Sequence, residues 1–274
     1  MFRLALRVPS TIPLELDGVT PEAVANLSAL EVGKLPVWHG NRSEELGQFF
    51  DVSTRITTAP GQADLLFAGD TRNVHRIGAG MSGGLVYVED AAGRHAGAGM
   101  TGGTLVIDSG VGDWLGAEMK GGAIEVRGSA GNMVGAAYRG SRHGMTGGTI
   151  HVRGDAGDEV GLLMRRGLIA VEGGVSEFAA ASMIAGTLVA GSVGRAVGAG
   201  MKRGTLLILA GEPAMGPGFR FSCDYSPAYL ELLFGDLRRI CFGKTAAIER
   251  HPVRCYRGDL VNGGTGEVLV LFHS

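Results

Sequence analysis

The stretch GAGMSG, residues 78–83, has the spacing G-x-G-x-x-G. This spacing binds the pyrophosphate of a dinucleotide when it follows a strand and opens a helix. The same pattern recurs at residues 97–102, and neither copy leads into a helical stretch or has an acidic residue placed to bind a ribose. We therefore interpret both copies as corners of a repeated structure and predict no dinucleotide cofactor.

Other residues that could do chemistry are scattered along the chain. The histidines form no H-x-H or H-x-x-x-H pair, so no zinc site is predicted. They are His39, His75, His95, His143, His151, His251 and His273. No G-x-S-x-G stretch supplies a nucleophilic serine, and Asp158-Glu159 is a lone acidic pair typical of a solvated corner. We predict no catalytic residue and no metal ligand.

Composition and charge exclude several classes of protein. A formal net charge of -2 and a pI of about 6.4 give no overall field that would attract nucleic acid or an anionic membrane. No apolar run is long enough to span a membrane, and residues 1–18 lack the apolar core of a signal peptide. The three cysteines form no C-x-x-C pair. These features favour a cytoplasmic location.

Glycine is the outlier, with 48 of 274 residues, and its placement follows a repeat. Met81, Met100 and Met119 are 19 residues apart, and a second series with the same spacing begins at Met145. Tyr138 lies 19 residues after Met119, and Met145 follows seven residues later. We interpret this as one unit used seven times, with a seven-residue insertion in the fourth at residues 139–145.

Aligning the units on these positions produces regular columns. Glycine stands three residues after the methionine in all seven units: Gly84, Gly103, Gly122, Gly148, Gly167, Gly186 and Gly204. It also stands three residues before the methionine, or before Tyr138 in the fourth unit, in all but one: Gly78, Gly97, Gly116, Gly135, Gly161, Ala180 and Gly198. Aliphatic residues fill the fifth and seventh positions after the methionine, with mixed residues between them. This alternation predicts a short strand with one face always buried, between corners of positive φ.

Strands of about four residues recurring every 19 leave no room for helical crossovers. We therefore predict a mainly β protein, a right-handed parallel β-helix (solenoid) of about seven 19-residue coils, with small α/β caps at both ends. The predicted domains are an N-terminal cap at 1–60, the solenoid at 61–211 and a helix-containing C-terminal cap at 212–274. Thr20-Pro21 and Ser226-Pro227 each predict a helix start. The second helix should run to about Arg239, with Tyr229, Leu232, Leu233 and Leu237 as its apolar stripe.

The glycine repeat resembles the GXGXG domain of glutamate synthase large subunits and of the C subunit of formylmethanofuran dehydrogenase. Stretches outside the repeat are similar to that C subunit: LGQFFDV at 46–52, LFAGD at 66–70, RGD at 257–259 and GGTGEV at 263–268. The alanine- and arginine-rich composition favours the bacterial form, the C subunit of the formyltransferase/hydrolase complex. The C subunit of an archaeal tungsten or molybdenum dehydrogenase and a glutamate-synthase-like scaffold domain remain the alternatives.

The resemblance implies a non-catalytic subunit in a one-carbon complex. Such a complex moves a formyl group between a tetrahydromethanopterin carrier and a methanofuran-type amine, and releases formate in the bacterial case. The implied partners are formyltransferase, amidohydrolase-like and dehydrogenase-like subunits, and these carry the chemistry. The resemblance carries no cofactor-ligating motif over to this chain.

Cations gather at one or two positions after the methionines, or after Tyr138 in the fourth unit, where Thr146 follows Met145 after the insertion. They are Lys120, Arg139, Arg165, Arg166, Lys202 and Arg203, with Arg142 in the insertion. Equivalent positions of stacked coils lie one above another, so Lys120, Arg139 and Arg165 are predicted to form a ladder with ~5 Å steps. In one interpretation these side chains face solvent or pair with Glu118, Asp113 and Asp158. In the other they bind the glutamyl tail of a methanofuran-type carrier. The insertion is either a partner contact or an ordinary surface loop.

Overall fold

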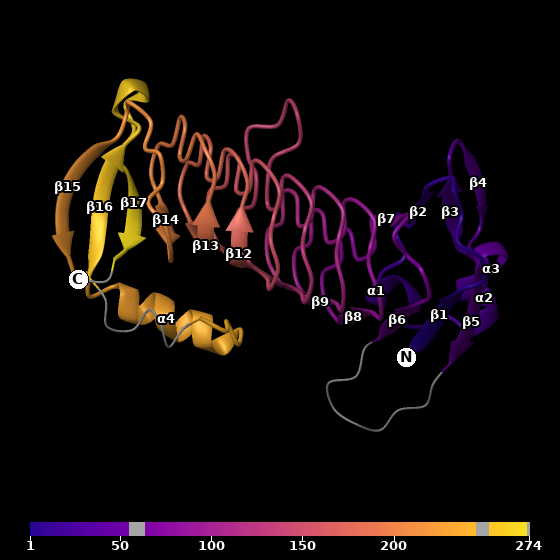
Figure 1. Cartoon of the computed structure of the whole chain (residues 1–274). Coiled ribbons are helices and arrows are strands. Elements are labelled where there is room, and N and C mark those ends of the chain that lie inside the picture. The colour runs from indigo at the N-terminus through magenta and orange to yellow at the C-terminus, as the bar shows by residue number, and fades with distance from the viewer. Residues whose placement is uncertain (55–63, 245–251, 273–274) are drawn as a thin grey trace.

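The computed structural model describes residues 1–54, 64–244 and 252–272 (Figure 1). Its main feature is an open 13-stranded sheet in the order β15-β16-β17-β14-β13-β12-β11-β10-β9-β8-β6-β1-β5. The repeat units supply its central strands, which are β8 (Leu85–Val88), β9 (Thr104–Ile107), β10 (Ala123–Val126), β11 (Thr149–Val152), β12 (Leu168–Val175), β13 (Thr187–Val193) and β14 (Thr205–Ile208). The chain is therefore mainly β, with a large and mostly parallel sheet.

Each repeat unit pairs with the next in parallel and in the predicted register. Ala123 of β10, for example, lies between Thr104 of β9 and Thr149 of β11. A second line of parallel bridges joins the units at another edge, through Ala92, Val111, Ala130, Ala156 and Val175. Successive units are thus tied together at two places, and Figure 1 shows them as a row of stacked turns.

The core is built from the columns that the repeat predicts. The seven methionines are fully buried: Met81, Met100, Met119, Met145, Met164, Met183 and Met201. In β8 to β10, the fifth and seventh residues after the methionine are buried and their neighbours are half-buried. One face of each strand therefore packs inward, as predicted, and stacked units bury a continuous apolar core.

The two glycine columns have the predicted positive φ. The glycines after the methionines have φ between 77° at Gly103 and 103° at Gly186. The column before the methionines also lies in the left-handed region, including its one alanine, Ala180, at φ 57°. Many of these glycines also lie so close to the neighbouring unit that a Cβ would strike it. The corners therefore need glycine both for backbone conformation and for space.

The N-terminal segment continues the same sheet and adds a smaller one. In the large sheet, β1 (Phe2–Leu6) pairs in parallel with β6 (Leu65–Ala68) and antiparallel with β5 (Phe50–Thr54). The small sheet has the order β4 (Arg42–Glu45), β3 (Pro36–His39), β2 (Leu14–Glu15) and β7 (Val74–His75). Three short helices pack here: α1 (Pro21–Val24), α2 (Ala29–Gly33) and α3 (Leu46–Phe49). Thr20 caps α1 as predicted.

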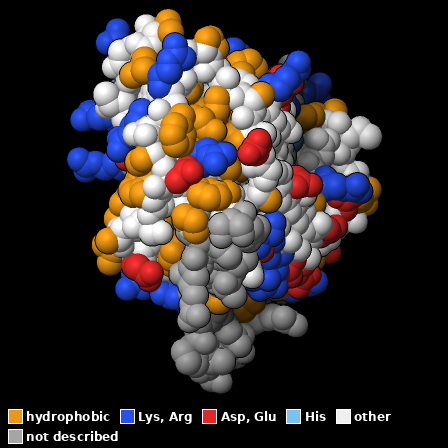
Figure 2. Space-filling model, turned by 60° about the vertical axis from the view of Figure 1, so that its left-hand side comes forward, with side chains coloured by type: hydrophobic (Ala, Val, Ile, Leu, Met, Phe, Trp, Pro, Cys, Tyr) orange, Lys and Arg blue, Asp and Glu red, His pale blue; other side chains and the backbone are white. Residues whose placement is uncertain are grey.

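The C-terminal segment closes the other end of the stack. The final strand, β17 (Gly266–Leu271), pairs in parallel with β14 as a further unit would. The chain direction then alternates through β16 (Val253–Gly258) and β15 (Arg220–Tyr225), and η1 (Leu260–Asn262) leads into β17. Viewed toward this end, hydrophobic side chains lie exposed among charged ones (Figure 2). Phe221 of β15 is 58% exposed.

Helix α4 (Leu230–Arg239) lies on the outer face of the sheet near β12 to β14 (Figure 1). It starts later than predicted, because its N-cap is Tyr229 and Ser226 lies before the helix. Its buried residues are Leu230, Phe234 and Leu237. The predicted stripe is therefore wrong for Leu232, which is 76% exposed. Leu232 lies two residues, about 200° around the helix, from the buried Leu230, so it faces solvent. The predicted stripe is also wrong for Tyr229, which precedes the helix and is 41% exposed. The division into three domains stays a prediction.

Candidate functional site

The predicted ladder of cations is corrected by the backbone hydrogen bonds between units. From the second unit on, the residue after the methionine donates its N–H to the methionine carbonyl of the preceding unit. Lys120 donates to Met100 at 2.7 Å, and Thr146 donates to Met119 at 2.7 Å. Thr146 therefore stands where the ladder placed Arg139. The prediction of a continuous Lys120–Arg139–Arg165 ladder is wrong, because Met145 and not Tyr138 fills the buried position of the fourth unit.

The insertion itself also shifts by one residue. Ala137 donates to Leu162 at 3.1 Å, and Met145 donates to Gly135 at 2.9 Å, so both belong to the regular corner. The extra residues are therefore 138–144, which project from the stack as a loop (Figure 1). Arg139 and Arg142 both lie in this loop. Lys120 and Arg165 are then two units apart, about 10 Å along the stack, which weakens their mutual repulsion.

All seven predicted cations are exposed, and they divide into three groups. Arg139 and Arg142 lie in the loop, Lys120, Arg165 and Arg166 on middle units, and Lys202 and Arg203 on the last unit. Lys202 donates to the carbonyl oxygen of Asn262. Within the described part of the chain no ion pair involves the other six.

The acidic residues proposed as their partners are bound elsewhere. Glu118 accepts the backbone N–H of Tyr138 at 3.2 Å. Asp113 accepts that of Asn132 at 2.7 Å, and Asp158 accepts that of Glu177 at 2.9 Å. These carboxylates tie adjacent units together. The exposed cations are thus left with solvent around them.

An aromatic cluster anchors the base of the loop. The ring of Tyr138 stacks on Trp114, with centroids 4.9 Å apart, and lies 5.6 Å from His95. The Tyr138 hydroxyl is 3.0 Å from Nδ1 of His95. Burial raises the pKa of Tyr138 and lowers that of His95, so the hydrogen bond joins two uncharged groups at neutral pH.

His95 and Trp114 belong to a corner column that the sequence reasoning missed. Five residues before each methionine, when the loop is not counted, the backbone is left-handed although no glycine stands there: Arg76, His95, Trp114, Met133, Glu159, Phe178 and Ala196 have φ between 56° and 67°. The alignment of the units would have brought these residues together. Their common conformation had no signal in sequence, because left-handed backbone is inferred from glycine or asparagine.

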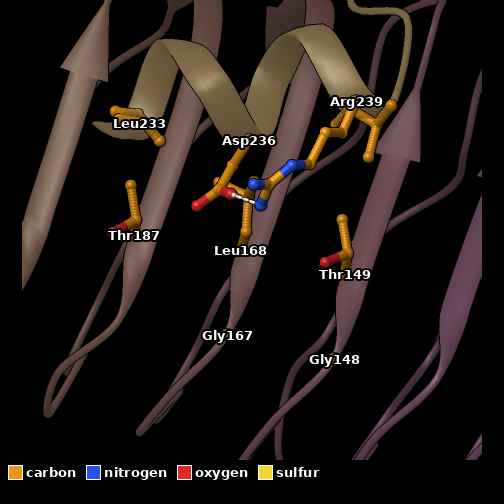
Figure 3. Close-up of a pocket in the computed structure, with 9 residues that line it drawn as sticks. Gly148, Thr149, Gly167, Leu168, Thr187, Leu233, Asp236 and Arg239 are labelled. Atoms are coloured by element: carbon orange, nitrogen blue, oxygen red, sulfur yellow. Dashed lines mark hydrogen bonds and ion pairs between the residues drawn. The ribbon is translucent and has the colours of Figure 1, made fainter. Parts of the chain in front are cut away.

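A pocket lies between α4 and the sheet. Its volume is about 450 Å³. Figure 3 shows Thr149, Leu168 and Thr187 on the strands facing Leu233, Asp236 and Arg239 on the helix. Arg239 is bound to Asp236 at 2.9 Å within the helix. The strand side of this pocket offers methyl and hydroxyl groups without a free charge, so we interpret it as a packing groove.

Both ends of the α4 region are pinned to the sheet by polar groups. At the start, the Tyr229 hydroxyl donates to Glu267 at 2.8 Å. Beyond the end, Glu172 on β12 accepts from Gly243 N at 3.1 Å and lies 2.8 Å from Nε2 of His151. His151 is 2% exposed and its Nδ1 has no hydrogen-bond partner. This buried pair fastens the chain after α4 rather than opening to a substrate.

The remaining titratable groups form no reactive arrangement in the described ranges. No group of three His, Cys, Asp or Glu residues there could hold a metal ion. Burial lowers the pKa of His75 and raises that of the Cys255 thiol, so each favours its uncharged form. His251 and His273 lie outside the described residues. No helix in the described part of the chain is long and apolar enough to cross a membrane.

Curated relatives and a solved structure are similar to this chain. No family model matches it. The C subunit of the molybdenum-containing formylmethanofuran dehydrogenase 1 of Methanosarcina barkeri is 41% identical over 84 residues, 31% of this chain and 28% of that protein. The C subunit of the formyltransferase/hydrolase complex Fhc of Methylorubrum extorquens is 34% identical over 91 residues, 32% of each. The matched stretches thus span about a third or less of these curated relatives.

A solved structure matches over the whole length. It is the crystal structure of the formyltransferase/hydrolase complex (FhcABCD) from Methylorubrum extorquens in complex with methylofuran. One of its chains matches with a TM-score of 0.89 and 33% identity, covering 99% of this chain and 100% of that one. Fold and corner columns therefore define a class, the glycine-repeat subunits of multi-subunit enzymes. Within that class, this chain belongs to the family of C subunits of formylmethanofuran dehydrogenase and formyltransferase/hydrolase complexes.

Proposed function

We propose that this chain is the C subunit of a formyltransferase/hydrolase complex and that it holds the catalytic subunits together without catalysing a step itself. The observation that carries the proposal is the full-length match to a chain of the FhcABCD complex. The proposed complex transfers a formyl group from formyl-tetrahydromethanopterin to a methanofuran-type amine and releases it as formate. This chemistry belongs to the partner subunits, because this chain has no nucleophile–base motif in its sequence.

The same proposal includes a finer description of the fold. We infer that the stacked units form a right-handed parallel β-helix with α/β caps at both ends, as the two lines of parallel pairing support. A rigid stack of this kind suits a scaffold, since each unit offers surface at its corners while the core stays closed.

The exposed cations support a second role, which is to bind the glutamyl tail of the carrier. Lys120, Arg165 and Arg166 lie on middle units, with Lys202 and Arg203 further along the stack. They are exposed and, among residues 1–54, 64–244 and 252–272, form no ion pair, although Lys202 donates to Asn262, so a chain of carboxylates could bind them at little desolvation cost. Arg139 and Arg142 are displaced into the loop and could meet the tail only there.

The test of this role is the binding of a glutamylated carrier to the whole complex. Replacing Lys120, Arg165 and Arg166 together by alanine should weaken binding at least about tenfold at low salt, and the difference should shrink at high salt. A matched triple variant with three other exposed arginines, Arg7, Arg42 and Arg72, replaced by alanine controls for net charge. Equal affinity of wild type and the first variant at every salt concentration would remove the tail from the proposal.

The test of the complex is its isolation from the native host. A tag on this chain should bring down a formyltransferase and an amidohydrolase, and the purified assembly should release formate from formyl-tetrahydromethanopterin. One observation favours a second candidate, the C subunit of a tungsten or molybdenum formylmethanofuran dehydrogenase, because such a protein gives the 41% match. Co-purified iron–sulfur and molybdopterin or tungstopterin subunits would establish that candidate instead. A chain that purifies alone would refute both.

A further inference from the structure

The loop at residues 138–144 is a local departure from an otherwise regular surface. Strands β10 and β11 on either side of it pair as directly as any other two units. The loop therefore adds nothing to the register of the sheet. Its residues contribute to the surface and not to the strand pairing, so their side chains indicate what the surface can bind.

The first residue of the loop is held firmly against the preceding units. Tyr138 packs with Trp114 on a row of alanines, Ala79, Ala98 and Ala117. The small side chains of that row let the two rings pack closely against it. The loop is thus fixed at one end by an aromatic stack while Arg139 and Arg142 stay exposed.

A pocket of about 270 Å³ opens on the other side of the same stack. Trp114 and Tyr138 form its aromatic wall, and Met133 and Leu163 add apolar surface. Arg139 and Glu159 also line it, so it carries one charge of each sign. Tyr138, Arg139, Gly140 and Ser141 of the loop all line the pocket, so the loop builds one side of it.

Besides Glu159 at φ 59°, three apolar residues that line the pocket sit in left-handed backbone. They are Trp114 at φ 67°, Met133 at 62° and Leu163 at 57°. This conformation costs a non-glycine residue about 1 kcal/mol, and these side chains are only half-buried in the free chain. Large apolar side chains at such corners gain their full burial only if something covers them. The pocket therefore has the character of an interface before assembly.

The size and charge of the pocket select its occupant. Its volume is below the roughly 300–1,000 Å³ of sites for cofactors and drug-sized ligands, so it suits one bulky side chain of a protein. Arg139 lines it, and Arg142 follows the lining residue Ser141 in the chain; neither arginine has an ion-pair partner in the part of the chain that is described. In a symmetric contact with a second copy, the exposed Arg139 and Arg142 of each copy would outnumber the single half-buried Glu159, which opposes self-association.

We propose that this pocket is a socket for another subunit of the complex, which inserts a large apolar or aromatic side chain next to a carboxylate that pairs with Arg139. The proposal rests on the proposed function, because it requires partner chains. It goes further by assigning the contact surface and the chemistry of the segment that fills it.

Deleting residues 138–144 tests the socket with little risk to the fold. The deletion joins Ala137 to Met145 and restores the spacing of 19 residues between Met119 and Met145. The variant should fold, judged by its circular dichroism and unfolding midpoint, yet bind the other subunits at least about tenfold more weakly, as for the loss of an interface anchor. Arg139→Glu should also weaken binding, and Arg139→Lys should restore most of it.

A photo-crosslinking amino acid in place of Ser141, which lines the pocket, identifies the occupant in the assembled complex. The expected product is a peptide of another subunit that carries a bulky apolar residue beside Asp or Glu. The same probe in place of the exposed Ser192 on β13 is the control for position.

The outcomes separate this inference from the proposed function. If wild type binds no other subunit, the proposed function fails. If wild type and the loop deletion bind equally well, or if the Ser141 probe crosslinks to a second copy of this chain or to nothing, the complex stands and the socket is refuted.

Discussion

Two glycines of the second unit differ in a way that makes the corner argument measurable. Gly99 and Gly103 both have positive φ, 66° and 77°. A Cβ on Gly99 would meet nothing within 4 Å, whereas one on Gly103 would lie 2.5 Å from the Met81 methyl and 2.8 Å from the backbone of Gly83. Alanine at either site carries the free-energy penalty of a left-handed backbone. Only alanine at Gly103 must also push the neighbouring unit away.

The magnitudes follow from these contacts. Gly99→Ala should cost about 1 kcal/mol of unfolding free energy, the penalty of the left-handed conformation. Gly103→Ala should cost about 2 kcal/mol more, because overpacking against backbone typically costs 1–3 kcal/mol. For a chain of this length that difference corresponds to roughly 3–4 °C in Tm. The repeat already tolerates side chains at the Gly99 position, with Glu118, Leu163 and Ser182 in other units.

Urea unfolding of both variants, followed by circular dichroism, compares their midpoints at a common slope. Gly80→Ala repeats the Gly99 experiment in the first unit, since a Cβ there also meets nothing within 4 Å. Equal losses at Gly99 and Gly103 would show that backbone conformation alone fixes the glycines. The close approach of units would then play no part in the repeat.

Two further predictions concern buried polar groups. Because burial holds the pKa of His75 below 6.5, its neutral form gives stability that is complete above pH 6.5 and lost as pH falls through the lower folded pKa. His75→Asn, which keeps an acceptor for the Arg94 N–H, should therefore flatten the fall in urea midpoint between pH 7 and 5, and an unchanged slope would contradict this. Glu172→Ala should cost about 2–3 kcal/mol by leaving His151 and the Gly243 N–H unpaired. Hydrogen exchange should then rise in residues 230–242, whereas the same change at the exposed Glu89 should have little effect.

The repeat could be predicted from sequence because each of its columns has one physical cause. The columns of Met119, Ile124 and Val126 are apolar because they form the core. The column of Gly122 is glycine because the backbone there is left-handed and crowded. Seven copies turn each weak local preference into a column. The position of the cations was harder to predict, because spacing alone placed Tyr138 in register with Met119. Only the bonds of Ala137 and Met145 reveal where the extra residues leave the corner.

Contacts between distant parts of the sequence were beyond prediction for a different reason. Glu172 meets Gly243 across more than seventy residues, and no periodicity relates the two. The start of α4 was misjudged because Ser226-Pro227 has the signature of a cap, while packing of Leu230 and Phe234 on the sheet decided where the helix forms. The family resemblance identified the family but gave no contact surface.

The loop at residues 138–144 also has an evolutionary and practical consequence. The chain leaves the stack before Met145 and returns without changing the pairing of Ala123 with Thr149, so length at this corner is uncoupled from the core. Closing a longer loop costs little extra entropy. The same corner recurs in every unit, so the molecule has a row of equivalent positions at which a loop could be inserted. New recognition segments could be grafted at chosen heights along it, each about 5 Å from the next, while the interior sequence stays unchanged.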